Sequence, residues 1–175
     1  MRVLSRQRGV SLIEVMMAVL IFSIGLIGLA SLMVMATRAN HTAYLRTQVV
    51  YLANSMAGRM SANSVGVWDG DYNGSYPVSS TSVGCGYGSA CDAAALATHD
   101  QRLWSAQLKT FLPNPTATIA CGGVGTAGYD PTSQLATRPP YGGTCTMTLN
   151  WNEQREGDQT HRDAEMQTFK WSFQP

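Results

Sequence analysis

Between Val10 and Ala36 the sequence contains no proline and only one ionisable residue, Glu14. A helical run of this length, at about 1.5 Å of rise per residue, is long enough to cross the ~30 Å hydrocarbon core of a bilayer. It is too long for the apolar region of an ordinary secretory signal peptide, which covers about 7–15 residues before a small-residue cleavage site. Residues 10–36 therefore predict a membrane-spanning helix.

Acidic residues are also missing from the nine residues that precede this run. This leader carries Arg2, Arg6 and Arg8, and positive charge of this kind stays on the cytoplasmic side of a membrane. A plain signal anchor would explain the length and the orientation, but it would leave Glu14 unexplained. A carboxylate costs about 2.5 kcal/mol or more at the bilayer centre, and less near the edge. We therefore expect Glu14 to be a functional residue with a partner.

The residues around the start of the run resemble a known family. Residues 8–14 read Arg-Gly-Val-Ser-Leu-Ile-Glu after a basic leader, which is similar to the class III signal peptide of type IV pilins and pseudopilins. The resemblance implies that a prepilin peptidase cleaves after Gly9 and methylates the new terminus at Val10. It also implies that Glu14 pairs with the terminal amine of a neighbouring subunit. Val10 replaces the phenylalanine usual in the family, a departure that concerns methylation more than cleavage.

The helical pattern continues beyond the apolar run. Past Thr37 the sequence becomes amphipathic, with apolar residues three or four positions apart at Leu45, Val49, Leu52, Met56 and Met60. One helix of about fifty residues, from Val10 to about Ala62, is predicted. Its second half, residues 37–63, is expected to pack through this stripe on a head domain formed by residues 64–175.

Cysteine is scarce and is confined to the segment beyond the membrane. The head contains Cys85, Cys91, Cys121 and Cys145, and an extracytoplasmic compartment favours two disulfides, with three connectivities possible. Proximity in the sequence favours Cys85–Cys91 and Cys121–Cys145. A zinc site is disfavoured because no pair has the Cys-x₂₋₄-Cys spacing and no histidines cluster nearby.

Charge is sparse and gives no sign of a nucleic-acid partner. The chain has twelve basic and eleven acidic side chains, and loss of the three leader arginines leaves nine basic ones and a net charge of −2. A protein that binds nucleic acid needs a basic patch or stripe. No such stripe is visible, so we expect no nucleic acid as a partner.

Residues 64–89 are rich in glycine, serine, tyrosine and asparagine, which predicts a loop. Within it, residues 69–74 read Asp-Gly-Asp-Tyr-Asn-Gly, the opening of a calcium-binding loop. The bidentate acid of such a loop should fall at position 80, which is Ser80, and no acid occurs between Asp71 and Asp92. We therefore interpret the stretch as a cluster of turns with no metal.

The remaining segments predict a second helix followed by strands. Residues 92–112 have the apolar periodicity of a helix stopped by Pro113, with Trp104 in its core face. Strands are expected at Thr116–Cys121, Thr144–Asn152 and Met166–Phe173, the last two joined by a charged loop from Glu153 to Glu165. Three or more antiparallel strands after a long helix give an α+β fold, and the resemblance makes it a type IV pilin-like one.

Signs of catalysis are absent. His41, His99 and His161 are scattered, and the sequence has no nucleophile elbow, phosphate loop or metal triad. A membrane-anchored hydrolase lacks an activated nucleophile with an oriented base. We expect neither enzymatic activity nor a cofactor.

The resemblance is closest to the PilV group of minor pilins. It rests on Glu14, on residues 52–63 and 97–100, and on Asp69, Tyr72, Trp104, Leu108, Leu112, Pro113 and Trp151. It implies a structural protein held in the bacterial inner membrane and then built into a pilus with the major pilin and other minor pilins. The alternative is a minor pseudopilin of a type II secretion system, which shares the leader and the acid. A third hypothesis is an adhesin whose head binds a surface ligand, and it is compatible with the minor-pilin hypothesis.

Overall fold

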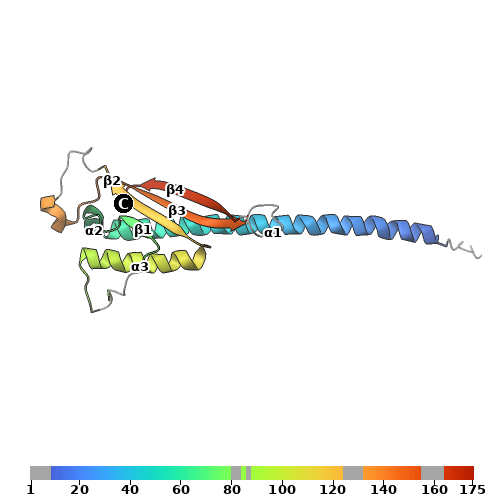
Figure 1. Ribbon diagram of the computed structural model, residues 1–175, viewed down its shortest axis with the longest axis horizontal. Coiled ribbons are helices and arrows are strands. Elements are labelled where there is room, and N and C mark those ends of the chain that lie inside the picture. The colour runs from blue at the N-terminus through green and yellow to red at the C-terminus, as the bar shows by residue number, and fades with distance from the viewer. Residues whose placement is uncertain (1–8, 80–83, 86–87, 124–131, 155–163) are drawn as a thin grey trace, which may run out of the picture. The chain divides into compact units, whose positions relative to one another are not determined.

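A computed structural model describes residues 9–79, 84–85, 88–123, 132–154 and 164–175. The leader residues Arg2, Arg6 and Arg8 lie outside this part, as do Ser80 and His161. Its elements are α1 (Leu12–Ala62), α2 (Ser64–Trp68), β1 (Gly74–Tyr76), α3 (Ala93–Phe111), β2 (Thr116–Gly122), the 3₁₀ helix η2 (Thr132–Thr137), β3 (Thr144–Gln154) and β4 (Ala164–Phe173) (Figure 1).

The chain forms two compact units, Met1–His41 and Thr42–Pro175. We call them the N-terminal unit and the head unit. Helix α1 continues through the boundary, so the head unit begins with residues 42–62 of that helix, about two fifths of its length. The single long helix predicted from the sequence is confirmed, although its first turn begins at Leu12 rather than Val10.

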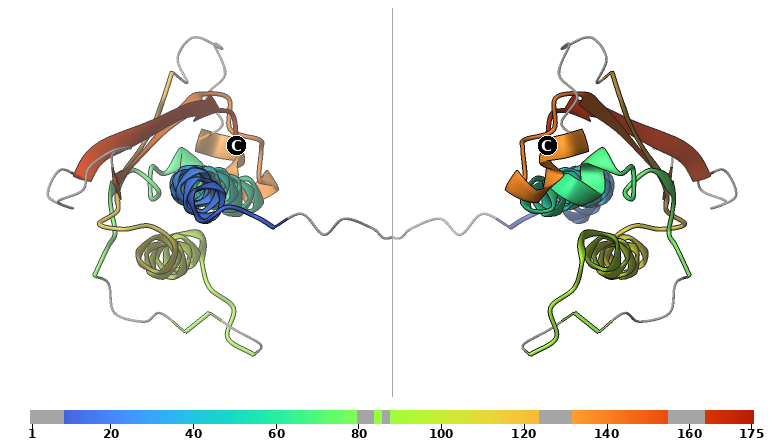
Figure 2. Two further views of the ribbon diagram at one scale, coloured as in Figure 1. Left: turned by 90° about the vertical axis from the view of Figure 1, so that its right-hand side faces the viewer. Right: turned by 90° about the vertical axis from the view of Figure 1, so that its left-hand side faces the viewer.

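The second part of α1 is the centre of the head's core. The predicted stripe is confirmed, since Leu45, Val49, Leu52, Met56 and Met60 are all buried. Figure 2 shows this part of α1 between the sheet on one side and α3 on the other. Burying a Leu or Met side chain contributes about 1.5–3 kcal/mol, so the stripe fixes α1 to both neighbours.

The sheet has the order β1-β2-β3-β4, and every pair is antiparallel. Alternation along β3 sends Cys145, Met147, Leu149 and Trp151 into the core, as their spacing predicts. On β4 the alternating residues Phe169, Trp171 and Phe173 are only partly buried against that core. The α+β fold is therefore confirmed, with a small antiparallel sheet packed on the long helix.

Helix α3 has a capped N-terminus, ends before a proline and buries one tryptophan completely. The Asp92 carboxylate caps its N-terminus by accepting a hydrogen bond from the Ala95 amide at 2.7 Å, and the helix ends before Pro113. Trp104 is fully buried, and its indole Nε1 donates to the Leu52 carbonyl of α1 at 2.9 Å. The predictions of this helix and of a core role for Trp104 are confirmed.

The predicted loop of residues 64–89 was partly wrong, because α2 and β1 form within it. The Asn63 side chain accepts from the Gly66 amide at 3.3 Å and caps α2. Strand β1 pairs with β2, and the calcium-like stretch becomes the turn before it, where Asn73 Oδ1 accepts from the Cys121 amide at 2.7 Å. Strand β1 has three residues and depends on a strand distant in the sequence, which local composition does not reveal, whereas α2 is a five-residue helix capped by the residue before it.

One polar cluster is buried where α1, α3 and the turn before β1 meet. Arg59 forms an ion pair with Asp100 at 2.8 Å, and the Tyr72 hydroxyl donates to the other Asp100 oxygen at 2.9 Å. Asn63 Nδ2 donates to the Tyr72 hydroxyl at 3.1 Å and to the Ala93 carbonyl at 2.8 Å. Burial raises the pKa of Tyr72. Because its members satisfy one another, the cluster stabilises the packing of α3 on α1.

Candidate processing and assembly site

The start of α1 presents the residues expected for processing. Gly9, Val10 and Ser11 precede the helix, and all three are exposed. A side chain added at Gly9 would meet no atom within 4 Å. Nothing in the described part of the chain therefore requires glycine at this position, and a requirement for it would have to come from a partner.

Ser11 is a residue that the sequence reasoning missed. Its carbonyl accepts from the Glu14 amide at 3.1 Å and from the Val15 amide at 3.3 Å, so it starts the helix. The signal was present in the sequence, because Ser-x-x-Glu before an apolar run is the spacing of a helix capping box. The helix begins at Leu12, two residues after Val10, and Glu14 lies four residues after Val10.

Glu14 lies in the first turn of α1 and is exposed. A negative charge is favourable there, by about 0.3–1 kcal/mol, because the helix dipole is positive at its N-terminus. Within the described residues the ion pair is Arg59–Asp100, and no cation is paired with Glu14. The carboxylate is therefore available to a cation from outside the described chain.

The surface around Glu14 is apolar on all sides. Large hydrophobic side chains remain exposed along the N-terminal unit, including Phe22 at 67% and Met33 at 72%. In the part of the chain that the structure describes, α1 is the helix whose length and composition suit a membrane span. Exposed apolar surface on this scale needs lipid or other apolar helices as its environment.

Three hydroxyl groups within the apolar part of α1 are already satisfied. Ser23 donates to the Val19 carbonyl at 2.7 Å, Ser31 to Gly28 at 2.8 Å and Thr37 to Val34 at 2.8 Å. A polar group without a partner is costly in an apolar medium. Hydrogen bonding to their own helix lets these side chains face lipid or a packed helix.

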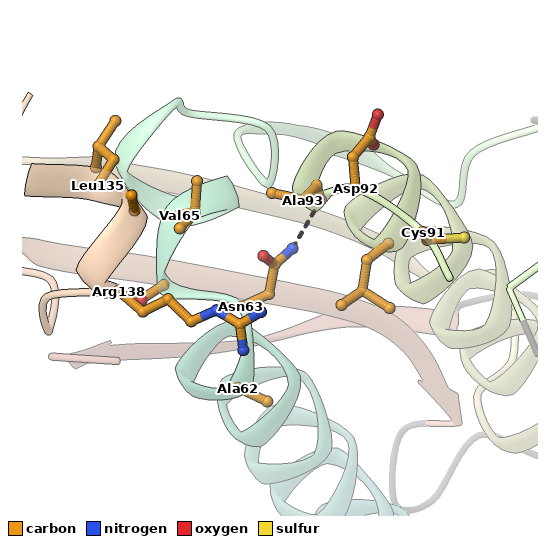
Figure 3. A pocket seen from close by; sticks show the side chains of 11 residues that line it. Ala62, Asn63, Val65, Cys91, Asp92, Ala93, Leu135 and Arg138 are labelled. Atoms are coloured by element: carbon orange, nitrogen blue, oxygen red, sulfur yellow. Dashed lines mark hydrogen bonds between the residues drawn. The ribbon is translucent and has the colours of Figure 1, made fainter. Parts of the chain in front are cut away.

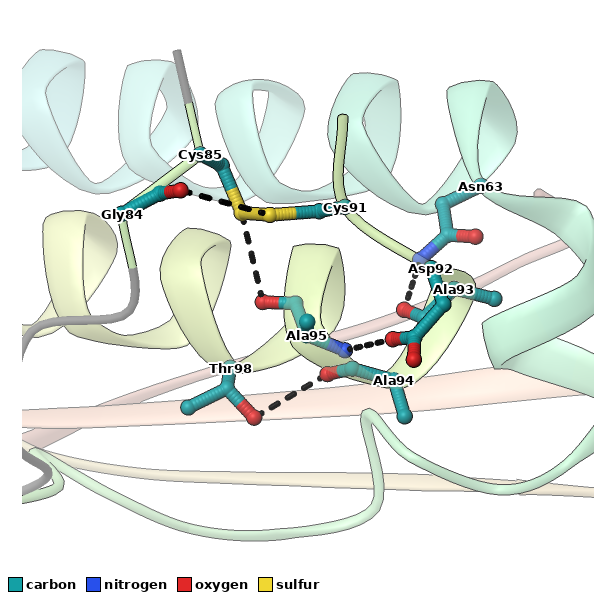
Figure 4. Close-up of a disulfide and its surroundings, with 9 residues drawn as sticks. All are labelled: Asn63, Gly84, Cys85, Cys91, Asp92, Ala93, Ala94, Ala95 and Thr98. Atoms are coloured by element: carbon teal, nitrogen blue, oxygen red, sulfur yellow. Dashed lines mark hydrogen bonds between the residues drawn. A yellow bond between two sulfur atoms is a disulfide. The ribbon is translucent and has the colours of Figure 1, made fainter. Parts of the chain in front are cut away.

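The four head cysteines form two disulfides. Cys85 pairs with Cys91 close to the start of α3 (Figure 4), and Cys121 pairs with Cys145 across neighbouring strands β2 and β3. This is the connectivity that sequence proximity favours. Cys145 is buried in the core, whereas Cys85 and Cys91 are only partly buried, so only the Cys121–Cys145 bond is anchored in the core of the head.

The head also contains a cavity of about 380 Å³ where α1 ends, lined in part by Asn63, Asp92, Leu135 and Arg138 (Figure 3). The Asn63 amide is already used by Ala93, Tyr72 and Gly66. Within the described ranges no group of three or more histidine, cysteine or acidic side chains could hold a metal. His41 and His99 lie on different helices, and neither is among the described residues that line this cavity.

Comparison with known proteins identifies the N-terminal segment. Residues 4–30 match the family model described as the prokaryotic N-terminal methylation motif. No curated protein and no solved structure matches the chain.

The match covers residues 4–9 of the predicted leader and most of the apolar run of residues 10–36. This motif is a type IV prepilin-like leader, and with the α+β fold it supports a type IV pilin-like or pseudopilin-like protein. Such a leader implies processing by a prepilin peptidase, anchoring in a membrane and assembly with other pilins. It points to a structural protein rather than an enzyme.

Proposed function

We propose that this chain is a minor pilin of a type IV pilus, of the PilV kind, acting in pilus assembly or modification. The observation that carries the proposal is the methylation motif at residues 4–30 with a lone acid in the first turn of an exposed apolar helix. The disulfide-bonded head and the single long helix suit a filament subunit. A minor pseudopilin of a type II secretion system is the second candidate, because it shares the motif.

In the proposed function the chain occupies two locations in succession. It is first held in the bacterial inner membrane by residues 10–36, with the N-terminus in the cytoplasm and the head in the periplasm. It then leaves the lipid and joins a filament with the major pilin and other minor pilins. In this account prepilin peptidase and membrane lipid are partners of the first stage, and no nucleic acid or cofactor takes part.

Cleavage after Gly9 links the two stages chemically. It removes the three leader arginines and creates a cationic α-amine at Val10, which the peptidase methylates. In the membrane Glu14 lies near the cytoplasmic edge and can reach interfacial water. In a filament that water is replaced by packed helices, so an unpaired carboxylate becomes costly. The α-amine of a neighbouring subunit would then pair with Glu14 and fix the axial position of the two chains.

Processing provides the test of this proposal. Gly9→Val should stop maturation, because a peptidase that must approach the scissile bond closely favours a residue without a side chain. Mass spectrometry should find a methylated Val10 terminus in the wild type and an intact leader in the variant. Gly25→Val, at another glycine with open space around it, is the matched control and should be processed normally. An intact Met1 on wild-type chains in sheared filaments would refute the proposal.

A further inference from the structure

The sheet of the head ends in two edge strands of very different length. Among the described residues β1 forms one edge; it has three residues and is followed at once by Pro77. Strand β4 forms the other edge, as the outermost strand in Figure 1. It has ten residues without proline, and its pairing with β3 runs from end to end without a bulge. The unpaired N–H and C=O groups of such an edge are a template for a further strand.

A row of aromatic side chains along β4 is incompletely covered. Phe169, Trp171 and Phe173 alternate along the strand and lie opposite core residues of β3 that are fully buried. The three rings themselves are only partly buried, and Trp171 stacks on Phe173 with ring centroids 4.6 Å apart. We call them the aromatic row. A strand added beside β4 would bring its own side chains over this row and remove apolar surface from water.

One end of β4 carries negative charge without a compensating cation. Glu165 lies directly opposite Glu153 of β3, and like charges in this position are destabilising. Glu153 is only 8% exposed, and its Oε1 atom has no hydrogen-bond partner. The ion pair in the described part of the chain is Arg59–Asp100, so no cation is paired with either glutamate there. A basic side chain on a neighbouring strand would relieve this repulsion.

The other face of β4 carries the opposite charge. Lys170 is exposed there and has no ion-pair partner among the described residues. A second copy of β4, added antiparallel, would continue the same two faces of the sheet. It would bring no acid to Lys170, because the remaining residues on that face are Ala164, Met166, Thr168 and Ser172, and it would bring no base to Glu165. The two charges therefore disfavour self-pairing and select a different chain.

We infer that the outer edge of β4 binds an extended segment of a different protein as a fifth strand. This segment has apolar residues at every second position over the aromatic row and a basic residue beside Glu165. On its other face it has an acidic residue beside Lys170. Main-chain hydrogen bonds supply the affinity in this mode of binding, and side chains supply the specificity. The inference goes beyond the proposed function, since it needs neither cleavage at Gly9 nor pairing of Glu14.

Photo-crosslinking of the full-length, membrane-inserted chain in the producing cell tests the inference. A photoreactive amino acid replaces Met166, Thr168 or Ser172 in turn, all exposed on the same face of β4. Mass spectrometry should map all three adducts to one segment of another protein, and the attachment points should advance as the probe positions do, by two and then four residues. The same probe at Thr118, which β3 separates from this edge, is the control and should not label that segment.

Three results would overturn the inference. They are no adduct from β4, attachment points that do not advance along one segment in steps of two and four residues, and adducts on β4 of a second copy of this chain. The first would leave the edge unoccupied. The second would indicate an occupant other than a strand, and the third an edge-to-edge dimer.

Charge reversal tests the predicted register. Lys170→Glu, combined with the probe at Ser172, should lower the yield of the adduct about tenfold or more, because like charges across an interface are strongly disfavoured. Replacing the partner's acidic residue nearest the mapped site with lysine should restore the yield. Lys109→Glu reverses an exposed charge on α3 and should leave the yield unchanged. An unchanged yield with Lys170→Glu, or no restoration by the partner's lysine, would refute the pairing of charges.

Discussion

Two acidic residues in this chain have opposite surroundings. Asp100 is buried, and its two carboxylate oxygens accept hydrogen bonds from Arg59 and Tyr72. Its charge therefore stabilises the packing of the head. Glu14 is exposed in the first turn of an apolar helix, with no ion-pair partner among the described residues. Removing the Asp100 carboxylate should therefore affect folding, whereas removing that of Glu14 should affect assembly.

Tyr72 gives the head a predictable response to alkaline pH. Burial raises its pKa above the ordinary value of 10.0 and does the same for Tyr76. A tyrosine whose pKa is higher in the folded state stabilises the fold fully below about pH 10, and this contribution is lost as pH rises further. The urea midpoint of the oxidised chain should hold steady up to pH 10 and then fall.

Tyr72→Phe isolates this effect. It removes the hydrogen bond to Asp100 and leaves buried groups unpaired, so unfolding at pH 8 should become easier by about 1–3 kcal/mol. Above pH 10 the decline should be shallower than in the wild type, because one of the tyrosines whose pKa is raised by burial, Tyr72, Tyr76 and Tyr141, is gone. Equal slopes for the two proteins would show that Tyr72 is not the titrating group.

At the scale of elements, the sequence was most informative where a pattern was long. Helix α1 and its buried stripe, helix α3 and the inner face of β3 all follow from periodicity over nine residues or more. The short elements were not predicted, because β1 depends on strand β2, which is distant in the sequence, and α2 is a helix of only five residues that begins at the Asn63 cap.

The candidate site was predictable for a different reason. Gly9, Val10 and Glu14 stand at fixed spacing in a segment where charge is scarce, so each can be recognised without knowing the fold. Ser11 was equally recognisable, because it stands three residues before Glu14, the Ser-x-x-Glu spacing of a helix capping box. The polar cluster around Asp100 could not be predicted, because Arg59, Tyr72 and Asp100 come together only through the packing of α1 against α3.

The two disulfides should differ in what they contribute to stability. Cys85 and Cys91 are six residues apart, whereas Cys121 and Cys145 are separated by 24. Closing the longer loop removes more entropy from the unfolded chain. Replacing the Cys121–Cys145 pair with alanines should therefore cost about 1 kcal/mol more than replacing the Cys85–Cys91 pair. Urea unfolding followed by tryptophan fluorescence measures both, and an equal or reversed order would contradict the loop-length argument.

At the scale of the whole molecule, α1 joins two kinds of unit in one continuous helix. The N-terminal unit exposes apolar side chains on all sides, and the head unit buries one stripe of the same helix in a disulfide-bonded core. A folded head on an exposed apolar helix is suited to two environments in turn, lipid and a bundle of similar helices. The central claim is that Glu14 allows the chain to enter a bundle of similar helices by pairing with the α-amine of a neighbouring subunit.

Incorporation of Glu14 variants into filaments tests that claim most directly. Glu14→Gln keeps the shape and hydrogen-bonding capacity but removes the charge, and Glu14→Leu removes both. Immunoblots of sheared filaments, compared with total protein, should show that each variant is cleaved and held in the membrane but enters filaments poorly or not at all. Incorporation of Glu14→Leu at the wild-type level would contradict the account.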